Sequence, residues 1–251
     1  MVDIHSHILA GLDDGPESLE ESITMLQMAA ESGTTDIVAT PHANPRYTYD
    51  PEIVDSKIAE LQAASASDVR IHRGCDFHLY YENIQQALLQ PARYTINGKR
   101  YLLVEFSEVT ILKSAGEIFG RMQDAGITPV VTHPERNALL ARNLDQVGRW
   151  VEAGCRVQVT AQSLFGRFGR KARAGAAKLM RRGLVHFIAS DAHDAMDRPP
   201  VLAEAYRHVA DEYGGPCAEV LFVTNPRAVL AGEMVEAAAP LQSAGRKWWL
   251  W

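Results

Sequence analysis

The sequence predicts an α/β fold in which short parallel strands and helices alternate along one domain. Seven apolar segments are separated by stretches with helical periodicity, and the 251 residues include no composition shift that would mark a linker. Parallel neighbours need crossover connections, and seven such units over this length favour a closed barrel. An open, doubly wound parallel sheet is the alternative.

The first expected strand begins at the start of the chain and carries two histidines, His5 and His7. Because alternate side chains of a strand share a face, we expect these two on one face and Ile4 and Ile8 on the other. Imidazoles about 6 to 7 Å apart along a strand can bind one metal ion. Alone, the pair fits ordinary surface residues as well as a metal site, and the acidic residues and histidines that follow the other apolar segments favour the metal site.

Capping residues delimit the expected helices. Ser18 with Glu21, and Ser114 with Glu117, form capping-box patterns, and Asp50 precedes a proline at a first helical position. Asn225, followed by proline, is expected to cap the last short helix. The expected helices span about 19–32, 51–64, 82–90, 115–125, 143–153 and 169–182, and helical patterns also follow residue 193.

Metal-binding residue types follow the apolar segments, just where each expected strand ends. After the first strand, the strands are expected at 36–40, 69–74, 101–104, 127–132, 156–160 and 185–189. Barrel enzymes place their chemistry at the C-terminal ends of the strands. Nitrogen and oxygen ligands without thiolate suit manganese, iron or zinc, and more ligands than one ion can use predict two or three bridged ions. The candidates at the strand ends are His5, His7, His42, Asp76, Glu105, His133, Asp191 and His193.

Composition narrows the class of protein. A formal charge of −6 and a pI near 5.8 argue against a nucleic-acid backbone as ligand. No secretory leader pattern opens the chain, and no apolar run approaches the roughly 18 residues of a membrane span, so a cytoplasmic protein is expected. A single domain over residues 1–251 is expected, with a short aromatic tail at about 241–251. Its three indoles are expected to pack on this chain or a second copy, or to contact a membrane surface.

Two hydrolase mechanisms are excluded by motif. Thiol phosphatases need an arginine six residues after the nucleophilic cysteine, and those positions hold Tyr81, Ala161 and Val223. Serine hydrolases of the nucleophile-elbow type need G-x-S-x-G, which does not occur in the chain.

The motifs together resemble the polymerase-and-histidinol-phosphatase (PHP) superfamily. The resemblance is strongest to the bacterial PHP-type tyrosine phosphatases of capsular and exopolysaccharide synthesis, and it covers nearly the whole chain. The motifs, by position, are DIHSH at 3–7, DDGP at 13–16, PH at 41–42, GCD at 74–76, VEF at 104–106, THPER at 132–136, ASDAH at 189–193, RPP at 198–200 and NPR at 225–227.

This resemblance implies a distorted seven-stranded (β/α)7, TIM-like barrel. It implies a three-metal cluster held by the residues above with Asp14, and two arginines near the substrate phosphate, matching Arg136 and Arg198. Manganese is the expected ion, with iron, zinc or cobalt as alternatives. The implied substrate is phosphotyrosine in a protein, such as the tail of an autokinase. A histidinol-phosphatase-type enzyme, a metal-dependent nuclease and a weakly catalytic metal-binding regulator are the alternatives.

The chain departs from the family pattern at Asp76, where glutamate is usual, and at His78, where tyrosine is usual. His78 could replace a missing ligand, although a supporting or surface role is the favoured interpretation. Glu135 is expected to be a surface charge, and Asp13 a turn or capping residue. The basic segment from Arg167 to Arg182 is interpreted as a solvated helix face, or as a docking strip for an acidic or phosphorylated partner. His72, His186 and His208 are interpreted as structural.

Overall fold

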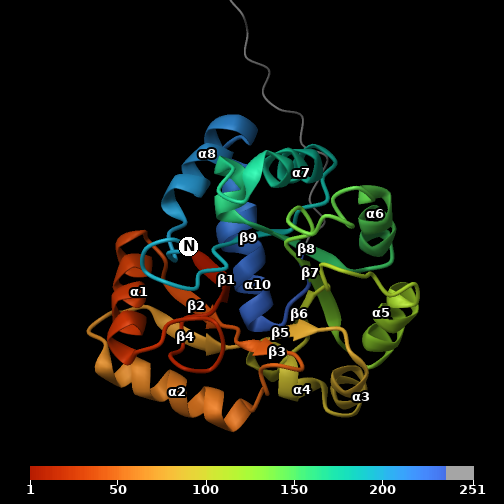
Figure 1. The fold of residues 1–251 in the computed structure, drawn as a ribbon. Helices are drawn as coiled ribbons and strands as arrows, with labels where there is room; N and C mark the ends of the chain where they lie inside the picture. Colours follow the sequence, from red (N-terminus) through yellow and green to blue (C-terminus); the bar gives the residue numbers. More distant parts are fainter. Residues whose placement is uncertain (236–251) are drawn as a thin grey trace, which may run out of the picture.

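The computed structural model describes residues 1–235, an α/β fold whose nine strands are all parallel to their neighbours (Figure 1). One sheet has the order β1-β2-β4 and the other the order β3-β5-β6-β7-β8-β9. A bridge between Ser6 and Ala192 joins β1 of the first sheet to the segment after β9 of the second. The predicted aromatic tail lies outside the described residues. The strands are β1 (Val2–Ser6), β2 (Asp36–Ala39), β3 (His42–Ala43), β4 (Arg70–Arg73), β5 (Asp76–His78), β6 (Tyr101–Glu105), β7 (Thr128–Thr132), β8 (Arg156–Thr160) and β9 (Phe187–Ala189).

All seven predicted strands are present, and two short strands were not expected. β3 and β5 directly follow β2 and β4, and each pair is separated by two residues. The break lets the chain pair in one sheet before it and in the other sheet after it. His42 and Asp76, which the sequence places just beyond strands, therefore lie inside strands of the second sheet.

Helices cover the outside of the sheets, as Figure 1 shows. The expected helices are present, with boundaries shifted by a few residues. α10 is the exception to the outer position, because it packs against strand residues. The helices are α1 (Leu19–Glu31), α2 (Pro51–Ala64), α3 (Tyr81–Leu89), α4 (Pro91–Tyr94), α5 (Ala115–Asp124), α6 (Leu144–Glu152), α7 (Gly169–Arg181), α8 (Ala203–Tyr213), α9 (Gly215–Glu219) and α10 (Asn225–Ala231), with short turns at Ile96–Gly98, Ala161–Phe165 and Val220–Thr224.

Two of the four capping predictions are confirmed. The Ser18 hydroxyl accepts a hydrogen bond from Glu21 N at 3.2 Å, and the Asp50 carboxylate accepts one from Glu52 N at 2.9 Å. Ser114 stands at the N-cap of α5 but its side chain makes no capping bond. The prediction for Asn225 is wrong, because this residue is already in α10 and its side-chain amide donates to the His186 carbonyl at 3.1 Å. Its amide thus ties α10 to the segment before β9.

The strands bury apolar side chains on both faces, as expected for a parallel sheet. One hydrophobic cluster packs strand residues such as Leu103 and Val130 around Val229 of α10, and the larger cluster lies beneath the surrounding helices. Ile4 belongs to the first cluster and Ile8 to the second, so the expectation that they share a face is wrong. β1 ends at Ser6, so strand alternation does not extend to Ile8, and the pairing register shifts between Asp3 and Ser6, a segment that includes His5.

No helix within residues 1–235 is both long and apolar enough to cross a membrane.

The buried His186 should make stability depend on pH. Its Nδ1 accepts a hydrogen bond from Val157 N at 3.2 Å, and burial, with the positive charge of Arg156, lowers the pKa of His186 to about 3. An unfolded histidine binds its proton near pH 6.5, so below that pH the unfolded state gains a proton that the folded state lacks. The free energy of unfolding should therefore decrease as the pH is lowered. The titration of His186 should account for a decrease of about 2 kcal/mol between pH 6.5 and 5.

His186→Gln keeps an acceptor for Val157 N but removes the titration. Urea unfolding of both chains at pH 7.5 and 5.0, with metal removed by chelator, should show the wild-type advantage shrinking by about that amount. A constant difference between the two chains would mean that the folded state also protonates His186.

Candidate metal centre

The nine predicted ligands meet at one end of the fold, where β1, β6, β7 and β9 end and where β3 and β5 begin. They come from β1 and the loop after it, from β3, β5 and the end of β6, and from the segments that follow β7 and β9. Together with His78, which was not among the nine, they form four overlapping groups within residues 1–235, and in each group the ligand atoms lie within 4.8 Å of one another. The groups are His7-Asp14-His42-His193, His42-Asp76-His78-Glu105, His5-His7-Asp76 and His5-His133-Asp191.

Two of the ligand candidates stand in strained backbone. His133 has φ of 31° and Asp191 has φ of 52°, a region that side chains other than glycine rarely adopt. Each follows the end of a strand, β7 or β9, and the positive φ turns the chain sharply there. Strain of this kind costs of order 1–3 kcal/mol and persists where the surrounding structure holds it, often at functional sites.

Three histidines are held with Nε2 directed toward the cluster. His5 Nδ1 lies 3.1 Å from Gln158 Oε1, His7 Nδ1 lies 2.6 Å from Asp13 Oδ2, and His193 Nδ1 lies 3.1 Å from the Asp191 carbonyl oxygen. These partners accept hydrogen bonds, so Nδ1 carries the proton and Nε2 keeps its lone pair. This is the usual support of metal-binding histidines.

The Nε2 lone pairs of two of these histidines point toward one another, and a cation between them would be favourable. His5 Nε2 and His7 Nε2 lie 3.4 Å apart, and neither would carry a proton in the tautomers above. The buried Asp76 carboxylate has no hydrogen-bond donor on either oxygen within the described chain, although its Oδ2 lies 3.1 Å from His42 Nδ1. Buried polar atoms without partners are costly, and divalent cations would satisfy all of these atoms together.

The charges at the site are strongly coupled. Burial opposes a charge on His5, but Asp191 and Asp76 outweigh it and raise its pKa to about 9, so a bound cation would take the place of the proton that these carboxylates favour on Nε2. Asp14 and Asp76 likewise outweigh burial at His42 and raise its pKa to about 11. Burial would raise the pKa of Asp76, yet His42 and His5 hold it well below the usual range. The Asp76 carboxylate is therefore ionised, as a metal ligand must be.

Three residues near the site have roles that were not expected from the sequence. Asp13 is no mere turn residue, since its Oδ2 also accepts a hydrogen bond from His42 N at 3.0 Å. Gln158 of β8 holds His5 and carries no motif signal. The expectation for Glu135 is wrong, because this side chain is 2% exposed and accepts hydrogen bonds from Thr160 N and Ser163 Oγ. Burial raises the pKa of Glu135 to about 7.

The structure places His78 within the cluster rather than at its surface. His78 Nε2 lies 2.6 Å from Glu105 Oε2 and 3.3 Å from His42 Nδ1. Burial opposes its charge, but Glu105 and Asp76 outweigh burial and raise the pKa of His78. The geometry favours His78 as an additional ligand candidate over the supporting role expected from the sequence.

Two arginines approach the cluster from one side. Arg136 forms an ion pair with Asp191 Oδ2, and Arg198 Nη2 lies 2.7 Å from the same oxygen. The Phe168 ring lies against both guanidinium groups, 4.0 Å from Arg136 Cζ and 5.7 Å from Arg198 Cζ. Paired donors of this kind match the oxygens of a phosphate.

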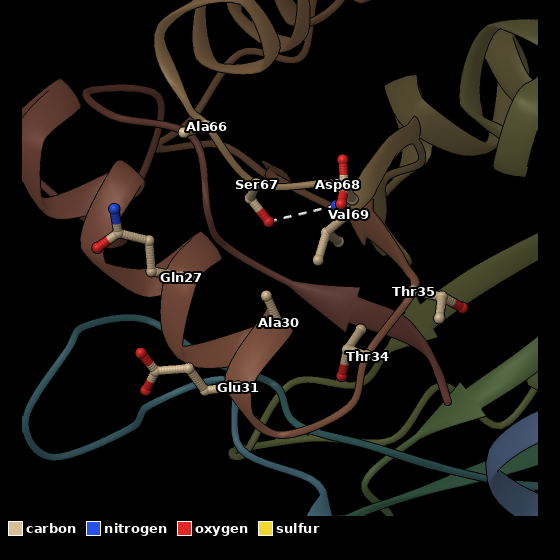
Figure 2. Close-up of a pocket in the computed structure, with 9 residues that line it drawn as sticks. All are labelled: Gln27, Ala30, Glu31, Thr34, Thr35, Ala66, Ser67, Asp68 and Val69. Carbon is tan, nitrogen blue, oxygen red and sulfur yellow. Dashed lines mark hydrogen bonds between the residues drawn. The ribbon is translucent and has the colours of Figure 1, made fainter.

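A separate pocket of about 690 Å³ lies away from these groups (Figure 2). Its lining includes Thr34 and Thr35 just before β2 and Val69 just before β4, so it opens at the N-terminal ends of the strands. No histidine or arginine lines it, and its two acidic residues, Glu31 and Asp68, are outside the four groups. The candidate metal centre is therefore a distinct site at the other end.

Comparisons with known proteins match nearly the whole chain. A family model described as "Capsular polysaccharide synthesis, CpsB/CapC" matches residues 1–231. CapC of Staphylococcus aureus is 36% identical, with 99% of this chain and 98% of CapC covered. The tyrosine-protein phosphatase CpsB of Streptococcus pneumoniae is 32% identical, with 94% and 100% covered, and the tyrosine-protein phosphatase YwqE of Bacillus subtilis is 32% identical, with 98% of each chain covered.

Solved structures agree at the level of fold. One of the crystal structures of YwqE and CpsB, described as unique metal-dependent tyrosine phosphatases, superposes with a TM-score of 0.89 at 31% identity and covers 98% of this chain and all of that one. The lactonase Lmo2620 of Listeria monocytogenes superposes with a TM-score of 0.61 at 14% identity, covering 93% of this chain and 95% of that one, which shows a shared fold alone.

Proposed function

Because the chain belongs to the CpsB/CapC family of capsular polysaccharide synthesis, we propose that it is a metal-dependent phosphomonoesterase acting on phosphotyrosine in a protein. We propose further that the chain is a single domain in which the two sheets close into a distorted seven-stranded barrel. The proposed setting is the cytoplasm, and the proposed substrate is an autokinase of polysaccharide synthesis.

One observation carries the proposal: nine acidic and histidine ligand candidates and two arginines converge at a single end of the strands. Ligands of this kind and number fit two or three divalent ions, with manganese as the first candidate and iron, zinc or cobalt as alternatives. When bound, such ions would acidify a water molecule and neutralise phosphate charge. The residues proposed to hold them are His5, His7, Asp14, His42, Asp76, Glu105, His133, Asp191 and His193, with His78 as an additional candidate.

The chain's own residues would orient the substrate. Arg136 and Arg198 would bind the phosphate oxygens, and their donors gain strength where charge develops in the transition state. Phe168 packs against both guanidinium groups and would hold their planes in position. Asp13 and Gln158 keep the Nδ1 protons of His7 and His5 in place, so that Nε2 stays available.

Substrate comparison tests the reaction class. The metal-loaded protein should turn over a phosphotyrosine peptide far faster than histidinol phosphate or a nucleotide diester. Faster turnover of histidinol phosphate would indicate a small-molecule phosphatase. Diester cleavage would indicate a nuclease, and metal binding without turnover would indicate a regulator.

Metal content is a second measurable outcome. We expect two or three transition-metal ions per chain after expression in metal-replete medium, because the candidate ligands outnumber the four to six positions of one ion. Elemental analysis of the purified protein measures this directly. Less than one ion per chain would contradict the cluster.

Asp76 and His78 should act as a coupled pair. Asp76 is one methylene shorter than glutamate, and His78 already lies beside Glu105 and His42. We therefore expect Asp76→Glu to crowd the cluster and lower activity, and His78→Tyr to lose one metal ion. The double variant should recover both, because residues that share a metal are coupled.

Metal titrations on the two single variants and the double variant would measure this non-additivity. Small, additive changes in metal affinity and rate would place both residues outside the cluster. Higher metal affinity in Asp76→Glu alone would mean that His78 does not compensate for the shorter carboxylate.

A further inference from the structure

A groove leads away from the paired arginines. It has a volume of about 500 Å³ and lies between the segment 135–142 and helix α7, with Arg136 and Phe168 at one end. A second hollow of about 290 Å³ continues it and shares Ala141, Arg142 and Lys178 with the first. The groove therefore begins beside the proposed phosphate position and extends along α7 toward the start of α6.

Small side chains form the floor of the groove. Ala172, Ala174 and Gly175 of α7 line it, and a Cβ on Gly175 would lie 3.2 Å from Glu135 Cβ. α7 therefore packs closely against Glu135, the residue before Arg136. The space above the floor is left open because no large side chain of α7 fills it.

The walls of the groove are positively charged. Arg142, Lys171 and Lys178 are exposed, and none has an acidic partner within 4 Å in the described part of the chain. Glu135 also lines the groove, but its carboxyl is buried and bonded to Thr160 and Ser163. At the far end, Asp145 is paired with Arg182 at 2.8 Å. The exposed cations between the two ends therefore face solvent uncompensated, in a chain whose formal net charge is −6.

The spacing of the cations suits an extended peptide. Lys171 and Lys178 are seven residues apart on α7, which places them about 10 Å apart along the helix axis. That length corresponds to about three residues of extended chain. Lys171 lines only the first hollow, which Arg136 also lines, whereas Lys178 lines both hollows, so acidic side chains a few residues from a bound phosphotyrosine would meet them in turn.

We propose that this groove, defined by Arg142, Phe168, Lys171, Ala174 and Lys178, binds glutamate- or aspartate-rich polypeptide flanking the phosphotyrosine of the substrate. The part of this inference that places a phosphotyrosine at the end of the groove rests on the proposed function. The proposal gives a role to the basic helix α7, which contributes no ligand candidate to the metal centre. Affinity comes from charge complementarity, so it should weaken as salt rises.

The test compares two phosphotyrosine peptides of equal length, one flanked by glutamates and one by glutamines. At low ionic strength, wild-type kcat/KM should be roughly 10-fold higher for the glutamate peptide, since two or three exposed charge pairs combine. The double variant Lys171→Glu with Lys178→Glu should lose or invert this preference. Its turnover of free phosphotyrosine should stay at the wild-type level.

A matched double variant controls for net charge. Arg121→Glu with Arg207→Glu makes the same charge change at exposed positions of α5 and α8 that do not line the groove. It should keep the wild-type preference. Equal loss of preference in this control, no preference in the wild type, or a parallel loss on free phosphotyrosine in the groove variant would each overturn the proposal.

Binding of an unphosphorylated glutamate-rich peptide, followed by fluorescence anisotropy, separates the groove from the reaction. If the wild type binds this peptide and the groove variant does not, the groove is supported. This holds even if the protein does not turn over phosphotyrosine. Absence of that turnover alone would overturn the proposed function. Absence of peptide binding alongside normal turnover would overturn the groove alone.

Discussion

His5→Ala and Asp191→Ala should each lower turnover of a phosphotyrosine peptide by more than about 100-fold and reduce the bound metal. His5 Nε2 lies 3.4 Å from Asp191 Oδ1 and 3.6 Å from Asp76 Oδ2, so each side chain faces the others across the cluster. Removing one leaves a cation short of a ligand, whereas loss of a supporting partner alone typically costs 10- to 100-fold. Elemental analysis and kcat/KM on the same preparation measure both effects.

His208→Ala is the matched control for loss of a histidine. His208 lies on α8, where it faces Glu212 at 3.3 Å, and it belongs to none of the four ligand groups. Its replacement should leave metal content and turnover unchanged. Wild-type turnover in His5→Ala or Asp191→Ala would show that the reaction does not need this cluster.

The alternation of strands and helices could be predicted from the sequence because each element carries a local signal. Apolar runs marked all seven predicted strands, and Ser18 and Asp50 cap helices as expected. Pro41 and Gly74 lie in the breaks between β2 and β3 and between β4 and β5, but nothing local indicates that the chain resumes pairing in another sheet. That switch depends on which neighbour each half pairs with, and this is decided by long-range register.

The candidate ligands could be picked out from the sequence because histidine and acidic side chains are common metal ligands, and here they directly follow apolar runs. Supporting residues obey no such restriction. Gln158 reads as an ordinary strand residue, and only the fold brings its amide oxygen to His5 Nδ1. Glu135 looks like a surface charge until α7 covers it, as the close approach of Gly175 shows. Burial is a property of the packed chain, so local sequence could not predict it.

Arg136→Ala and Arg198→Ala should lower kcat/KM for a phosphotyrosine peptide while leaving metal content unchanged. Their guanidinium groups meet at Asp191 and are held by Phe168, but they carry no lone pair for a cation. One such contact in the transition state is typically worth roughly 2 to 4 kcal/mol, or about 30- to 1,000-fold in rate.

Arg136→Lys separates charge from geometry at this position. Lysine keeps the positive charge but loses the paired donors, so we expect activity between those of the wild type and Arg136→Ala. Metal content measured beside kcat/KM distinguishes substrate binding from support of the cluster. If metal is lost together with activity in either alanine variant, the arginines hold Asp191 in place rather than the phosphate, because both pair with its Oδ2.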